Sequence, residues 1–178
     1  DEGELTYRGR WVSYGSILFE PKPALPLPLL VGGNHANALR RAAMLGDGWH
    51  PLFLEPTDYA RGRKAIEDLR READLTRPFL FSMSGSEVRL LDAANALPGR
   101  REAAQGTSYA PAVGGDARGR QRFIGTPREV RDDCRALGDA GVEQLVLRFA
   151  MPLDPLVGPQ QHSEQLRRFA GEVLPYLA

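Results

Sequence analysis

Residues 27–51 read LPLLVGGNHANALRRAAMLGDGWHP, and this stretch decides the fold because it places a strand, a Gly-Gly turn and a helix in direct succession. Residues 29–31 form a continuous apolar run, which is typical of a strand buried on both faces of a parallel sheet. Gly32 and Gly33 follow at the carboxyl end of that strand. Ligands bind at such ends in parallel α/β folds, so the turn is a candidate binding site.

A helix is predicted to begin directly after the turn, from Asn34, a residue suited to N-capping. Its apolar positions repeat at helical spacing until Gly46 ends it; they are Ala38, Leu39, Ala42, Ala43 and Leu45. A helix N-terminus offers free N–H groups and a positive dipole end to an anion. Two interpretations are open for Gly32, Gly33 and Asn34: plain turn chemistry, or a phosphate site.

Several motifs flank this stretch in a fixed order. They are Tyr7-Arg8-Gly9-Arg10-Trp11, Pro21-Lys22-Pro23, Val31-Gly32-Gly33 and Asp47-Gly48-Trp49, followed by residues 123–130 (FIGTPREV) and 140–148 (AGVEQLVLR). In order and separation they resemble the luciferase-like flavin and deazaflavin oxidoreductases. The resemblance covers residues 7–91 and 123–177, and it depends on the order of the motifs more than on any single one.

The resemblance implies a (β/α)8 TIM barrel of the bacterial luciferase-like type. Such a barrel takes about 250 residues, whereas this chain has 178. About four strands are predicted, over residues 29–33, 49–53, 79–90 and 144–149. We therefore expect residues 1–178 to form one partial barrel domain, the carboxyl-terminal half. Its open edges and half-exposed lining would need cover from a second copy, a partner, or an amino-terminal half.

The resemblance also implies a cofactor, either FMN or the deazaflavin coenzyme F-420, with its phosphate near Gly32, Gly33 and, less firmly, Asn34. The reaction would be hydride transfer with coenzyme F-420, or monooxygenation with FMN, on a small organic substrate. No catalytic residue can be named, because the family's ring pocket comes largely from the early strands. Two alternatives stay open: a catalytically inactive half barrel that needs a partner, and a phosphate-binding α/β domain without flavin.

Between the motifs the chain alternates strand and helix. Helices are predicted over residues 58–75, 127–140 and 163–177. Residues 79–90 are predicted to form a strand interrupted near Gly85, either by a bulge or by a loop that splits it into two strands. The helix from Pro127 has a strong start signal, because Thr126 and Glu129 have the spacing of a capping box. Residues 92–122 are rich in Ala, Gly and Arg without sustained periodicity, which predicts a flexible loop or an insertion.

The three histidines have neither the spacing of metal ligands nor that of a nucleophile and base pair. His35 could touch a phosphate or cap the turn, His50 could line the substrate pocket or be structural, and His162 is expected at the surface. Cys134 is expected to be a small core residue. Arg148 could face the barrel mouth or pair with a neighbouring carboxylate.

Composition excludes several classes of function. The formal net charge is zero, from 23 basic and 23 acidic residues, so the chain lacks the basic footprint of a nucleic-acid-binding protein. The longest apolar run is too short to cross a bilayer. A single cysteine cannot form an internal disulfide. Together these features favour a cytoplasmic protein.

Overall fold

The computed structural model describes residues 3–18, 20–92, 120–149 and 159–177. In chain order the strands are β1 (Glu4–Arg8), β2 (Ser13–Leu18), β3 (Leu30–Val31), β4 (Gly48–Trp49), β5 (Leu80–Glu87), β6 (Arg89–Leu90), β7 (Ile124–Gly125) and β8 (Gln144–Arg148). The helices are α1 (Ala36–Leu45), α2 (Pro56–Glu72), α3 (Pro127–Asp139) and α4 (Pro159–Glu172), and a short 3-10 helix, η2 (Leu174–Tyr176), follows α4.

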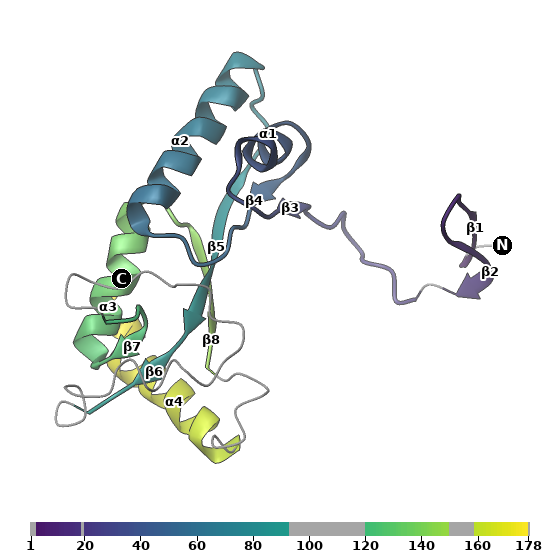
Figure 1. Cartoon of the computed structure of the whole chain (residues 1–178). Helices are drawn as coiled ribbons and strands as arrows, with labels where there is room; N and C mark the ends of the chain where they lie inside the picture. Colours follow the sequence, from purple (N-terminus) through teal and green to yellow (C-terminus); the bar gives the residue numbers. More distant parts are fainter. Residues whose placement is uncertain (1–2, 19, 93–119, 150–158, 178) are drawn as a thin grey trace.

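The main sheet has the strand order β3-β4-β5-β8, and all its pairings are parallel. Helix α1 connects β3 to β4, α2 connects β4 to β5, and α3 lies between β5 and β8 in the sequence (Figure 1). This alternation confirms the predicted α/β class with a parallel sheet. Within the described residues the sheet is open, with β3 and β8 at its edges, as expected for half of a barrel.

The core lies between the sheet and the helices. Trp49 of β4 is fully buried and stacks on Tyr59 of α2, with ring centroids 4.9 Å apart. Phe81 and Met83 of β5 and Val130 and Leu137 of α3 are also buried, in the same apolar cluster. Successive side chains of a strand point to opposite faces. Because Trp49, Phe81 and Met83 point toward the helices, their neighbours on β4 and β5 point toward the other face of the sheet.

Several predicted boundaries were wrong. Helix α1 begins at Ala36, and its N-cap is His35 rather than Asn34. Helix α2 begins at Pro56, because proline suits the first helical turn, and it ends at Glu72. The predicted helix over residues 163–177 is instead α4, which begins at Pro159, followed by η2.

Of the two interruptions predicted near Gly85, the structure shows the bulge and not the loop: β5 continues through this residue, and its register with β8 shifts between Ser84 and Glu87. A Cβ atom at Gly85 would lie 2.8 Å from Leu147 and 3.0 Å from Phe123. Glycine is therefore needed there for close packing against neighbouring side chains. A separate break comes at Val88, between β5 and β6.

The start of α3 confirms the predicted capping box. Thr126 accepts a hydrogen bond from the backbone N–H of Glu129, and the Glu129 carboxylate accepts one from the backbone N–H of Thr126. Cys134 packs against the core, as predicted, and burial raises the pKa of its thiol to about 12. Such a thiol is protonated at neutral pH and is a poor nucleophile.

A buried ion-pair cluster lies between α3 and the start of β7. Arg120 binds both carboxylate oxygens of Asp133, at 2.7 and 2.6 Å, and both side chains are almost fully buried. Arg122 binds Glu55, the N-cap residue of α2, at 2.6 Å. Most of the predicted loop, residues 93–119, lies outside the described residues, but Arg120 and Arg122 at its end belong to this cluster.

The amino-terminal part is an antiparallel hairpin of β1 and β2. Every residue of both strands is exposed. An extended, proline-rich segment over residues 20–29 joins the hairpin to β3, and the hairpin lies well away from the main sheet (Figure 1).

Candidate functional site at the carboxyl ends of the strands

The Gly-Gly turn adopts a conformation that requires glycine. Gly33 has a φ of +92°, and a Cβ atom on it would lie 3.0 Å from the Cβ of Ala38. Gly32 follows β3 directly, and a Cβ atom there would lie 3.5 Å from the carbonyl oxygen of His50. A side chain at position 33 would therefore be strained and would also fill the space between the turn and α1.

The Asp-Gly-Trp motif fixes this turn. The carboxylate of Asp47 accepts a hydrogen bond from the backbone N–H of Leu29 at 2.9 Å. The indole Nε1–H of Trp49 donates to the carbonyl oxygen of Gly33 at 2.7 Å. Gly48 allows β4 to approach β5, because a Cβ atom there would lie 2.6 Å from the carbonyl oxygen of Leu80. Through the hydrogen bonds of Asp47 and Trp49, the motif holds the turn in a fixed position against the buried core.

The amino-terminal end of α1 begins immediately after the turn. His35 is the N-cap residue, but its side chain makes no capping hydrogen bond, and both Asn34 and His35 are exposed. The first N–H groups of a helix that lacks a side-chain cap are available to an anion. Beside this end lies a groove of about 410 Å³ between the turn and α2, to which Asn34, Trp49 and Arg61 contribute.

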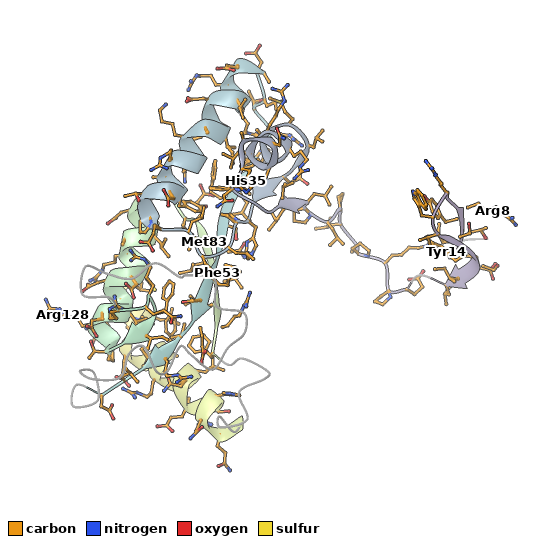
Figure 2. The ribbon with its side chains drawn as sticks, in the orientation of Figure 1. Arg8, Tyr14, His35, Phe53, Met83 and Arg128 are labelled. Atoms are coloured by element: carbon orange, nitrogen blue, oxygen red, sulfur yellow. The ribbon has the colours of Figure 1, made fainter. Side chains whose placement is uncertain are left out.

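The face of the sheet opposite the helices carries polar side chains from three strands or their ends. They are His50, which follows β4, Ser82 and Ser84 of β5, and Arg148 of β8. Nδ1 of His50 lies 2.8 Å from Oγ of Ser82, and Nη2 of Arg148 lies 3.5 Å from Oγ of Ser84. Phe53, labelled in Figure 2, follows β4 in the sequence, and its ring contacts the guanidinium of Arg148. We call these four residues the inner-face row.

His50 is partly buried in the inner-face row. Burial lowers its pKa from the ordinary value of 6.5, so the ring is neutral at pH 7. One ring nitrogen, Nδ1, is engaged with Ser82. A neutral imidazole with one nitrogen fixed can offer the other to a ligand as a hydrogen-bonding or proton-transfer group.

The described residues favour one of the two interpretations of Arg148. Arg148 makes no ion pair with any of them, and its guanidinium contacts Ser84 and the ring of Phe53. It lies at the carboxyl end of β8, at the mouth of the sheet. By contrast, the half-buried Arg89 nearby binds Glu87 at 2.9 Å.

Sequence reasoning missed Ser82 and Ser84. A signal for them exists, because serine occupies alternate positions in the otherwise apolar strand sequence LFSMSGSE. Two serines with the spacing of one strand face predict a polar stripe on that face. The contact of Ser84 with Arg148 joins residues 64 positions apart, and no local pattern reveals it.

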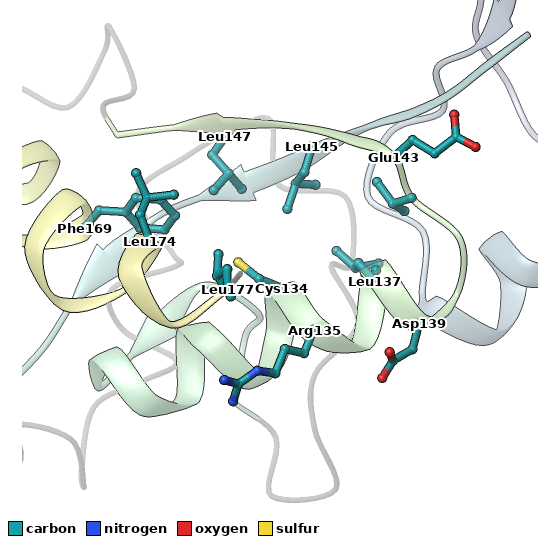
Figure 3. Close-up of a pocket in the computed structure, with 12 residues that line it drawn as sticks. Cys134, Arg135, Leu137, Asp139, Glu143, Leu145, Leu147, Phe169, Leu174 and Leu177 are labelled. Atoms are coloured by element: carbon teal, nitrogen blue, oxygen red, sulfur yellow. The ribbon is translucent and has the colours of Figure 1, made fainter.

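A larger cavity of about 470 Å³ lies on the helix side of β8, between α3, α4 and η2 (Figure 3). Its walls near the sheet are apolar, formed by Leu145, Leu147 and Phe169, and Cys134 projects into it. Arg135, Asp139 and Glu143 also line it, and Glu143 pairs with Arg63 at 3.4 Å and accepts a hydrogen bond from the backbone N–H of Phe81.

Two further classes of site can be assessed over residues 3–18, 20–92, 120–149 and 159–177. There, no three side chains among His, Cys, Asp and Glu gather closely enough to hold a metal ion. No helix in these ranges has the length and apolar character required to span a membrane.

Solved structures with this fold are enzymes of the luciferase-like barrel type. An F-420-dependent secondary alcohol dehydrogenase, in complex with an F-420-acetone adduct, aligns with a TM-score of 0.64 and 16% identity over 100% of this chain and 57% of its own. The coenzyme F-420-dependent tetrahydromethanopterin reductase from Methanopyrus kandleri has a TM-score of 0.61 and 19% identity, over 99% of this chain and 59% of its own. The monooxygenase RslO1 from Streptomyces bottropensis has a TM-score of 0.62 and 21% identity, over 99% and 57%.

By sequence, an uncharacterized protein of Mycobacterium tuberculosis is 37% identical over 85 residues, which are 46% of this chain and 29% of that protein. No family model matches the chain. The chain spans less than two thirds of the length of each of these relatives. At these identities the structural likeness establishes the fold: the chain has the α/β architecture of flavin- and F-420-dependent barrel enzymes, over a little more than half their length.

Proposed function

We propose that the chain belongs to an oxidoreductase of the luciferase-like type that binds a flavin-type cofactor, FMN or coenzyme F-420, with the cofactor phosphate at the Gly-Gly turn. The observation that carries this proposal is the turn itself. Gly33 has a left-handed conformation with no room for a side chain, and it is followed by a helix N-terminus without a side-chain cap. These features fit a phosphate, which needs close backbone approach and N–H donors.

In this proposal Gly32, Gly33 and Asn34 hold the phosphate through the backbone and the N-terminus of α1, and Trp49 keeps the turn in place through its bond to Gly33. The bound cofactor would supply the redox chemistry, which is hydride transfer for coenzyme F-420 and oxygen activation for FMN. The inner-face row would contact the substrate, and His50 would hold or release a proton at Nε2 because its Nδ1 is engaged with Ser82.

The test is a fluorescence titration of the purified chain with FMN and, separately, with coenzyme F-420. Saturable binding of one cofactor is expected, and a Gly33→Val variant should bind it at least about tenfold more weakly, because the valine blocks the turn. Gly138→Ala is the matched control, since Gly138 is an exposed glycine of α3 with open space around it. Equal affinity in a folded Gly33→Val variant would refute the phosphate site.

A second candidate is a half barrel that is inactive until a partner completes it. Exposed apolar side chains on the inner face favour this candidate: Leu30, Leu52 and Val146 are 38%, 51% and 42% exposed, and β3 and β8 are edge strands within the described residues. Light scattering recorded during the titration separates the two. A folded chain that binds neither cofactor and associates with itself would favour the half barrel.

A further inference from the structure

Arg148 occupies an unusual position for a half-buried cation. It is the last residue of β8, so it lies at the carboxyl end of a parallel strand, where ligands of such sheets bind. Its Nη2 lies 3.5 Å from Oγ of Ser84, which is at the long limit of a hydrogen bond. A guanidinium has five N–H donors, so most of its donors are not used by this contact.

The charge of Arg148 is not balanced within the described part of the chain. Its register partner on β5 is Glu87, but that carboxylate binds Arg89 at 2.9 Å. Arg122 and Arg168, which are also partly buried, each bind a carboxylate. A partly desolvated guanidinium without a carboxylate has a strong tendency to bind an oxyanion, which accepts two parallel hydrogen bonds from it.

Phe53 fixes the guanidinium from one side. The centre of the Arg148 guanidinium lies 5.5 Å from the centroid of the Phe53 ring, within the range of a cation–π contact. Phe53 has a φ of +54°, which is strained for an aromatic residue. Two backbone bonds to β5 hold it there: Phe53 N–H to the Ser84 carbonyl, and Ser84 N–H to the Pro51 carbonyl, each 3.0 Å.

We propose that Arg148 is a specificity-determining residue that binds the carboxylate, sulfonate or phosphate group of an organic anion. The buried Ser84 hydroxyl accepts a hydrogen bond from Arg148 and helps to orient it, and the exposed side chains of Leu52 and Val146, on the same face, would contact an apolar part of that molecule. This inference rests on the proposed function in one respect, namely that the bound anion is the substrate of the oxidoreductase.

The probe for this site is hexane-1-sulfonate, which joins an oxyanion to an apolar chain. Titrated into the full chain and followed by amide chemical shifts, it should bind saturably. Arg148→Gln should weaken binding at least about tenfold, and Arg148→Lys should weaken it less, because lysine keeps the charge but not the fork of donors. Hexan-1-ol, which lacks the anion, should bind equally to all three proteins.

Arg128→Gln is the matched control, because Arg128 is an exposed arginine of α3 that projects away from the sheet (Figure 2). The inference is overturned if wild type does not bind the sulfonate, or if Arg128→Gln loses as much affinity as Arg148→Gln. It is also overturned if binding is lost in Gly33→Val but kept in Arg148→Gln, because the anion would then occupy the Gly-Gly turn.

The same variants separate this inference from the proposed function. Cofactor affinity should be unchanged in Arg148→Gln, since the cofactor phosphate is assigned to the turn. If neither cofactor binds wild type but sulfonate binding still requires Arg148, the anion site stands and the oxidoreductase proposal fails. Should a cofactor bind while the sulfonate does not, the anion site fails and the oxidoreductase proposal stands.

Discussion

Trp49 connects the buried core to the Gly-Gly turn, because its ring stacks on Tyr59 and its Nε1–H donates a hydrogen bond to the carbonyl oxygen of Gly33. A Trp49→Phe variant should lose about 2–3 kcal/mol of unfolding free energy, from one hydrogen bond and the smaller ring. It should also bind the cofactor more weakly. Tyr59→Phe is the control: it removes the buried bond to the Ser82 carbonyl, at about 1 kcal/mol, without touching the turn. Urea unfolding and cofactor titration measure both effects, and equal cofactor affinity in the two variants would contradict this role of Trp49.

His50 should make stability depend on pH in a defined direction. Burial lowers its pKa below 6.5 in the folded chain, so the unfolded chain takes up the proton at a higher pH than the folded chain does. The unfolding free energy contributed by His50 is therefore complete above pH 6.5 and falls as pH decreases from there toward the folded pKa. His50→Gln should flatten this part of the profile, measured by urea unfolding between about pH 5 and pH 7. An unchanged slope in the variant would assign the pH dependence to other groups.

At the scale of elements, the buried cluster around Asp133 attaches α3 to the start of β7. The Asp133 carboxylate accepts bonds from Arg120 and from the backbone N–H of Phe123, which has a strained φ of +65°. Asp133→Asn removes the buried carboxylate that pairs with Arg120 and should cost about 3–5 kcal/mol of unfolding free energy. Asp132→Asn, one residue away, breaks only an exposed pair with Arg135 and should cost less than about 0.5 kcal/mol. Similar losses in the two variants, measured by urea unfolding, would mean that the cluster is not a structural anchor.

The elements also differ in how far the sequence predicts them. The start of α3 could be predicted to the residue, because Thr126, Pro127 and Glu129 form a local signal. The choice between a bulge and a loop near Gly85 could not be made from the sequence, because it depends on the register of β5 against the distant strand β8. The same reason applies to the candidate site. The Gly-Gly turn is continuous in sequence and was predicted, whereas the inner-face row brings together three strands and required the structure.

At the scale of the whole molecule, the chain consists of a parallel α/β unit and an amino-terminal hairpin joined by an extended segment. The hairpin is apolar on its surface, and Trp11, Val12 and Leu18 are 83%, 60% and 70% exposed. Its side-chain bonds, such as that between Ser16 and Glu4 at 2.6 Å, are internal to the hairpin. The stability of the α/β unit should therefore depend little on the hairpin.

Deletion of residues 1–22 tests this independence. Removing a segment that buries no apolar surface against the α/β unit should leave the midpoint of thermal unfolding within about 2 °C of the full chain. Calorimetry measures the unfolding midpoint of the full and the shortened chain, and a second protein concentration is the control for self-association. A lower midpoint that is the same at both concentrations would mean that the hairpin packs on its own sheet. A loss of stability seen only at the higher concentration would mean that the hairpin's apolar surface is covered by a second copy, because association stabilises the folded state by mass action.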